Sequence, residues 1–88
     1  MREILRALID DTSRQIPLME SAIRELDSQR CARLAHYSKG ACANVGASAA
    51  AEVLKAMEYQ AISRRFPECR ESLTALVQQM ELLRAETL

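Results

Sequence analysis

Apolar residues recur along the first 26 residues at intervals that alternate between four and three. This spacing is typical of a helix that packs almost parallel to its neighbours along one face. The row consists of Leu5, Ile9, Thr12, Ile16, Met19, Ile23 and Leu26. Pro17 falls inside the row, and a proline within a helix removes one hydrogen bond and clashes with the preceding turn. We therefore expect residues 3–26 to form a kinked helix, or two helices separated by a break near residues 13–16.

A second helix is predicted to follow directly. Asp27 is a favourable N-cap, so this helix should begin near Ser28 and continue to about Asn44. The sequence Asn44-Val45-Gly46 then provides a stop, because Asn and Gly readily adopt left-handed backbone angles. On a helical wheel, one arc of this segment is apolar or small and should face the protein interior. It holds Leu34, Ser38, Ala41 and Val45, with Cys31 and Cys42 beside them.

Two more helices complete the pattern. Ser48 can cap a third helix, which should extend to Arg64-Arg65 and end at Phe66-Pro67, since the residue before a proline avoids helical angles. Pro67 can begin a fourth helix, because proline is favoured in a first helical turn. The predicted inner faces are Ala49, Ala50, Val53, Leu54, Met57 and Ala61 for the third helix, and Leu73, Leu76, Val77, Met80, Leu83 and Leu88 for the fourth.

Connections of a few residues require consecutive helices to run antiparallel. The pattern therefore predicts an all-α fold, an antiparallel up-down-up-down four-helix bundle that occupies residues 1–88 as a single domain. The composition agrees, because helix-forming residues dominate and the chain contains only two glycines and two prolines.

Charge and cysteine content narrow the functional classes. The formal net charge is zero, which argues against a nucleic-acid-binding protein held by a basic surface. The three cysteines form no CxxC pair, so we expect buried free thiols in a reducing compartment rather than a disulfide framework or a zinc site. No apolar run approaches the length of a transmembrane span, and we expect a cytoplasmic module without direct membrane contact. A longer parent chain, such as a membrane-anchored kinase, is compatible with this expectation.

The most informative segment surrounds His36, the only histidine. The helical wheel places this residue opposite the apolar arc, so its ring should point into solvent. Lys39 and Gly40 lie one turn further along the same outward face. Gly40 within a helix costs about 1 kcal/mol relative to alanine, which a helix alone does not require. A lone surface histidine is usually just a solvated polar residue, but this combination indicates a surface that a partner approaches closely.

The run from Ala35 to Ala47, AHYSKGACANVGA, resembles the signature of the histidine phosphotransfer (HPt) family. That signature reads Ala-His, any residue, apolar, Lys-Gly, two small residues, two of any kind, apolar, Gly-Ala. Asp27 and the pair Met57-Glu58 also stand where the family often has Asp and Leu-Glu. Ser38 is a departure, since the family usually has a larger apolar residue there. Because the wheel turns Ser38 inward, we expect its hydroxyl to bond the carbonyl one turn back.

The resemblance implies that His36 accepts a phosphoryl group on Nε2, from an aspartate of one receiver domain, and passes it to another. Lys39 would stabilise the phosphoryl charge and Gly40 would give steric clearance. The implied partner-docking residues are Gln29, Ala32, Arg33, Tyr37 and Ala43. The implied partners are response-regulator receiver domains and a hybrid sensor histidine kinase. Such a module is a covalent phosphoryl carrier and not an enzyme.

The residues near His36 limit what it can do alone. No carboxylate lies one turn away on the same helix, so we expect none to orient the ring or to act as a base. The chain also contains no glycine-rich nucleotide loop and no aspartate cluster for Mg²⁺. We therefore expect no cofactor or metal of its own, with Mg²⁺ and most catalytic groups on the receiver domain.

Two alternatives belong to other classes. The first is a helical bundle that binds a signalling partner without phosphorylation, although the joint presence of His36, Lys39 and Gly40 argues against it. The second is the dimerising segment of a histidine kinase, which typically has an acidic residue directly after its histidine. Tyr37 occupies that position here.

Overall fold

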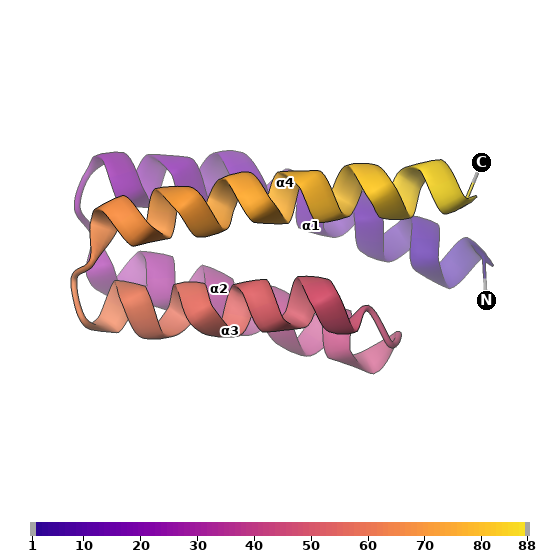
Figure 1. Ribbon diagram of the computed structural model, residues 1–88, viewed down its shortest axis with the longest axis horizontal. Coiled ribbons are helices and arrows are strands. Elements are labelled where there is room, and N and C mark those ends of the chain that lie inside the picture. Colours follow the sequence, from indigo (N-terminus) through magenta and orange to yellow (C-terminus); the bar gives the residue numbers. More distant parts are fainter. Residues whose placement is uncertain (1, 88) are drawn as a thin grey trace.

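Four α-helices contain most of the residues that the computed structural model describes, which are residues 2–87. Their bounds are α1 (Arg2–Arg24), α2 (Ser28–Asn44), α3 (Ser48–Ile62) and α4 (Phe66–Thr87). Successive helices run in opposite directions, and both ends of the chain lie at the same end of the bundle (Figure 1). The predicted all-α, up-down-up-down bundle is confirmed, and the described residues contain no β-strand.

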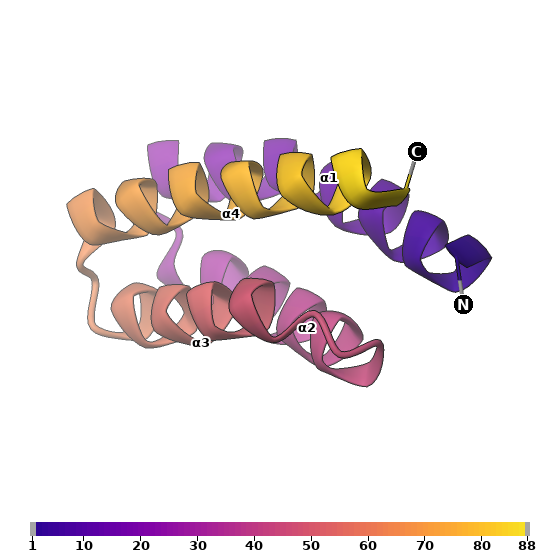
Figure 2. The ribbon, with the colours of Figure 1, turned by 45° about the vertical axis from the view of Figure 1, so that its right-hand side comes forward.

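The helices form two layers, with α1 and α4 side by side over α2 and α3 (Figure 2). Each helix packs against its two neighbours around the bundle, whereas no described Cα atom of α2 lies within 8 Å of one in α4. The largest side chains that are completely buried come from α1, α3 and α4, and they are Ile9, Met19, Ile23, Leu54, Met57 and Leu76. Within residues 2–87, no helix is long and apolar enough to cross a membrane.

The cysteines lie in this core as free thiols, as the sequence predicts. Burial raises the pKa of the Cys31 thiol to about 12, so the thiol stays protonated and unreactive. Cys31 in α2 and Cys69 in α4 face each other across the bundle. The separation of their helices exceeds the Cα distance that a disulfide can span without backbone movement.

The sequence left open whether Pro17 kinks the first helix or breaks it into two. The expected break is wrong, because α1 is one helix from Arg2 to Arg24 with Pro17 inside it. Core residues lie on both sides of the proline, including Thr12 before it and Met19 after it. Burial of both halves against α2 and α4 outweighs the cost of the proline, about 3 kcal/mol for the missing hydrogen bond and the steric clash together.

All three connections share one backbone design. In each, one residue has a positive φ: Leu26 (57°), Gly46 (77°) and Arg64 (57°). The next residue donates its N–H to a carbonyl five positions back, with N···O distances of 2.8–2.9 Å. This is the Schellman arrangement, which ends a helix and reverses the chain within about three residues. The predicted stop at Asn44-Val45-Gly46 is confirmed.

The positive φ values explain several misplaced boundaries. Leu26 terminates α1 rather than extending its apolar row, and its side chain is exposed. Arg64 lies beyond α3, which ends at Ile62 and not at Arg64-Arg65. The charged and apolar side chains at these two positions do not signal a left-handed residue, whereas Gly46 does.

The helix starts were predicted more closely. Asp27 caps α2 by accepting a hydrogen bond from the Arg30 N–H at 3.2 Å. Ser48 is the first residue of α3 rather than its cap, which is Ala47 and provides no side-chain hydrogen bond. Pro67 lies in the first turn of α4, one residue after its start at Phe66. Of the predicted inner-face residues, Ala49 is exposed, and Leu88 lies outside the described residues.

Ser38 faces the core as predicted and is 1% exposed. The expected hydrogen bond to the preceding turn is absent, because the Ser38 hydroxyl has no partner among the described residues. A buried hydroxyl without a partner is destabilising, so Ser38 weakens the packing of α2 at this point.

Replacing Leu26 with glycine is expected to raise the free energy of unfolding by about 1 kcal/mol. A left-handed backbone costs an ordinary residue roughly that amount and costs glycine almost nothing. Denaturant unfolding followed by circular dichroism measures the change. Leu26→Ala is the matched control, since alanine keeps the Cβ atom and its steric cost. Destabilisation by Leu26→Gly would instead mean that the leucine side chain packs against the bundle.

Candidate functional site

The row of α2 residues that are buried against the other helices determines the direction in which His36 points. This row consists of Cys31, Ala35, Ser38 and Cys42. On the helical wheel it is rotated by roughly 60° from the predicted centre of the apolar arc. Leu34, Ala41 and Val45 are only partly buried. His36 is exposed, as predicted, but it lies on the shoulder of α2 that faces α3 rather than directly opposite the core.

Because of this rotation, His36 meets a carboxylate from the next helix. Its Nδ1 atom lies 3.1 Å from Oε2 of Glu58 and 3.3 Å from Oε1. The histidine side chain is 68% exposed, whereas Glu58 is 22% exposed. The expectation that no carboxylate orients the ring is therefore wrong for the folded protein, although it holds within α2.

Lys39 completes a three-residue cluster. Its Nζ atom donates to Oε1 of Glu58 at 2.9 Å. The hydrogen bond from Lys39 holds the pKa of the Glu58 carboxyl below its usual value, and the contact with His36 acts in the same direction. Glu58 is thus a carboxylate at neutral pH, with one lysine and one histidine on its two oxygen atoms.

The ionised carboxylate selects one form of the imidazole ring. A carboxylate can only accept hydrogen bonds, so the contact with Glu58 requires a proton on Nδ1 of His36. In the neutral ring, the lone pair then belongs to Nε2. That nitrogen is on the far side of the ring from the Nδ1 contact, and the ring is mostly exposed to solvent. The cluster therefore presents a nucleophilic nitrogen in a fixed orientation.

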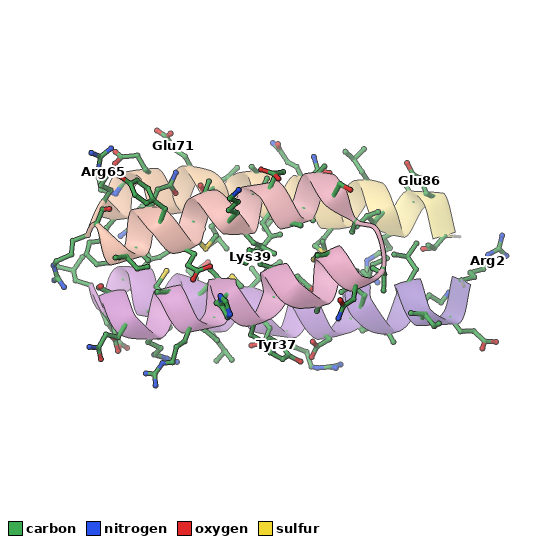
Figure 3. The ribbon with its side chains drawn as sticks, turned by 90° about the horizontal axis from the view of Figure 1, so that it is seen from below. Arg2, Tyr37, Lys39, Arg65, Glu71 and Glu86 are labelled. Atoms are coloured by element: carbon green, nitrogen blue, oxygen red, sulfur yellow. The ribbon has the colours of Figure 1, made fainter. Side chains whose placement is uncertain are left out.

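Tyr37 flanks the histidine on the other side. Figure 3 shows Lys39 on the side of α2 that faces α3, with Tyr37 on the opposite side. The Tyr37 hydroxyl donates to Oδ2 of Asp11 in α1 at 3.0 Å, and this hydrogen bond raises the pKa of the tyrosine. Tyr37 is 56% exposed, so its ring remains available at the surface.

A shallow hollow of about 360 Å³ surrounds His36. It is lined by Ala32, Arg33, His36, Tyr37 and Glu58. The structure thus brings together three of the five predicted docking residues with the histidine. Gln29 belongs to an adjoining hollow, and Ala43 is exposed two turns from His36 in the other direction.

Gly40 is exposed one turn beyond His36. A Cβ atom added at this position would meet no described atom within 4 Å, apart from neighbouring backbone. Packing inside this protein therefore does not explain the glycine. Its position leaves open space one turn from the histidine.

Sequence reasoning missed Glu58 as a site residue. The glutamate is 22 positions from His36, so helical spacing around the histidine could not identify it. The available signal was the family-like pair Met57-Glu58 in the third helix. In the part of the chain that the structure describes, no group of three or more His, Cys, Asp or Glu side chains is placed to hold a metal ion.

Comparison with protein-family models gives a match to the model described as Hpt domain, over residues 3–86. Comparisons with curated proteins and with solved structures give no match.

Replacing Glu58 with glutamine is expected to lower the free energy of unfolding at pH 7 by about 0.5–1 kcal/mol, through loss of the pair with Lys39. Because folding lowers the pKa of Glu58, its stabilisation is complete above the ordinary carboxyl pKa. It disappears as the pH falls through the lower value of the folded state. The difference between the two proteins should therefore start to narrow as the pH falls below the ordinary glutamate pKa of about 4.3, measured by urea unfolding at several pH values.

The matched control is Glu52→Gln, which removes an exposed carboxylate from the same helix. This variant should show no comparable pH-dependent difference. A loss in Glu58→Gln that persists at low pH would mean that the glutamate acts by packing and not by charge.

Proposed function

The chain belongs to the Hpt domain family, and from this membership we propose that it is a phosphorelay intermediate that carries a phosphoryl group on His36. The family has a phosphotransfer role in phosphorelays. The proposal for this chain is that His36 accepts the group from an aspartate of one receiver domain and delivers it to another. The observation that carries the proposal is the contact between Nδ1 of His36 and Glu58, at 3.1 Å.

This contact supports both directions of transfer. In acceptance, the lone pair of Nε2 attacks the phosphorus atom of the phosphoaspartate. The N–P bond forms while the bond from phosphorus to the aspartate oxygen breaks, and the aspartate leaves as a carboxylate. The ring keeps its Nδ1 proton and becomes positively charged, a change that the neighbouring Glu58 carboxylate stabilises. In delivery, the same Nδ1 proton lets the imidazole leave as a neutral group.

Lys39 and Arg33 are two basic residues of α2 beside His36. Lys39 is held by Glu58 one turn from the histidine, where its charge can stabilise phosphoryl oxygens. Arg33 lines the hollow around His36 and has no ion-pair partner among the described residues. Gly40 leaves room for the active-site loops of the partner, and Gln29, Ala32, Tyr37 and Ala43 contribute docking surface.

The protein acts in this proposal as a carrier and not as an enzyme. Phosphoryl transfer depends mainly on positioning and on stabilisation of charge. We assign Mg²⁺ and the acidic residues that bind it to the receiver domain. The proposed partners are receiver domains and a hybrid sensor histidine kinase. The proposed location is the cytoplasm, as a separate module or as part of a membrane-anchored kinase.

Receiver domains are first phosphorylated with labelled acetyl phosphate in the presence of Mg²⁺. They should then transfer the labelled phosphoryl group to the wild-type protein. The label should be labile in acid and stable in base, and His36→Gln should receive none. We expect Glu58→Gln to accept label about tenfold more slowly, because the neutral amide no longer stabilises the positive charge that the ring gains during transfer. Lys39→Ala should also be slower, with an unchanged circular dichroism spectrum.

Glu52→Gln controls for the loss of a charge elsewhere on α3 and should transfer at the wild-type rate. If receiver domains bind the wild-type protein but transfer no labelled phosphoryl group to it, the result would favour the alternative, a bundle that binds partners without phosphorylation. Label retained by His36→Gln would place the phosphoryl group on another residue.

A further inference from the structure

A second hollow adjoins the one around His36, towards the end of the bundle that holds the α1–α2 and α3–α4 connections. It measures about 380 Å³ and is lined by Ser28, Gln29, Ala32, Arg33 and Ile62. We call it the loop-end hollow. Ala32 and Arg33 line both hollows, so the two hollows adjoin on the surface between α2 and α3.

Ile62 is the notable residue of the loop-end hollow. It is the last residue of α3 and lies one turn beyond Glu58, yet its side chain is 63% exposed. Single exposed apolar residues are common on protein surfaces and need no explanation by themselves. Ile62 differs because it borders a hollow that adjoins the one around the reactive histidine.

The distances place Ile62 within reach of any protein that contacts His36. Ala32 and Gln29 lie about 6 Å and 10 Å from His36 along the axis of α2, at 1.5 Å per residue. A transient complex that buries about 600 Å² on each partner covers a patch with a radius of roughly 14 Å. A patch of this size centred on His36 therefore extends over the loop-end hollow.

The opposite direction along α2 offers no comparable anchor. Tyr37, the residue next to His36, is the last large apolar side chain that the described part of α2 exposes in this direction. Beyond Tyr37 the exposed residues of α2 are Gly40, Ala43 and Asn44, which are small or polar. Away from His36 and Tyr37, the apolar contacts that a partner makes along α2 therefore lie mainly on the side of Ile62.

We propose that Ile62 is a docking anchor that determines which receiver domains this protein accepts. An apolar side chain from the receiver surface, next to its phosphorylated aspartate, inserts into the loop-end hollow and packs against Ile62 and Ala32. Arg33 stands at the rim between the two hollows, where its free charge faces the acidic residues that hold Mg²⁺ in the receiver. This inference rests on the proposed phosphotransfer function and adds a specificity-determining residue to it.

The test compares two phosphoryl donors on the same variants. One donor is a receiver domain charged with acetyl phosphate, which must dock on the surface. The other is phosphoramidate, a small molecule that needs no docking surface. With phosphoramidate, the N–P bond of the donor breaks, ammonia leaves, and a new N–P bond forms at Nε2 of His36.

Three variants are compared with the wild type. Ile62→Ser removes the anchor, Ile62→Val keeps it, and Leu82→Ser is the matched control. Leu82 is an equally exposed residue of α4, which does not contact α2.

Ile62→Ser should raise the receiver concentration needed for half-maximal transfer by about tenfold, as expected for the loss of a central apolar anchor. Its labelling by phosphoramidate, its maximal transfer rate and its unfolding temperature should stay near the wild-type values. Ile62→Val and Leu82→Ser should transfer like the wild type.

Unchanged concentration dependence in Ile62→Ser would overturn the docking assignment, and so would an equal loss in Leu82→Ser. Slower labelling of Ile62→Ser by phosphoramidate would also overturn it, because Ile62 would then act on the histidine and not on the partner. Failure of the wild-type protein to be labelled by either donor would overturn the proposed function itself.

Discussion

Three residues, 45–47, join α2 to α3, and this short connection fixes how the two helices face each other. The left-handed Gly46 sets the reversal, after which Glu58 lies beside His36. A shift of one residue in this register would move Glu58 by about 1.5 Å along the axis and turn it by about 100°. The hydrogen bonds to His36 and Lys39 would both be lost. The chemistry of the site therefore depends on the geometry of a connection that contains no reactive group.

Charge is balanced within the cluster in a way that suits a reversible carrier. When the His36 ring is neutral, the charges of Lys39 and Glu58 neutralise each other. Glu58 also accepts the hydrogen bond from Nδ1 of His36, so the same carboxylate contacts both basic residues. When the ring gains positive charge, the carboxylate can respond without a change of fold. A phosphoryl group on Nε2 would in turn attract Lys39. In the proposed transfer, the two basic groups and the carboxylate would therefore keep complementary charges before and after the step.

The sequence was sufficient to predict the four helices, but not to predict which face each helix turns towards its neighbours. The alternation of four and three residues identified the first helix, because burial of one face imposes that period, and capping residues and stop signals identified the other three. The alternation could not show that packing carries α1 through Pro17, because the compensation comes from contacts with other helices. The inward arc of α2 was placed incorrectly because small residues such as Ala35 carry little hydrophobic signal, although they allow the closest approach to α3. The exposure of His36 was predicted, whereas its partner Glu58 depends on that approach and was not.

The three buried thiols give this small protein an internal measure of how often it opens. Cys31, Cys42 and Cys69 have no exposed surface in the folded bundle. A thiol reagent can modify them only after helices separate, so the rate of modification reports the population of opened molecules. Two of these cysteines lie on the inner face of α2, the helix that carries His36 on its outer side. A partner that docks on the outer face of α2 would hold the helix against the core, and it would slow the modification of these cysteines from a distance.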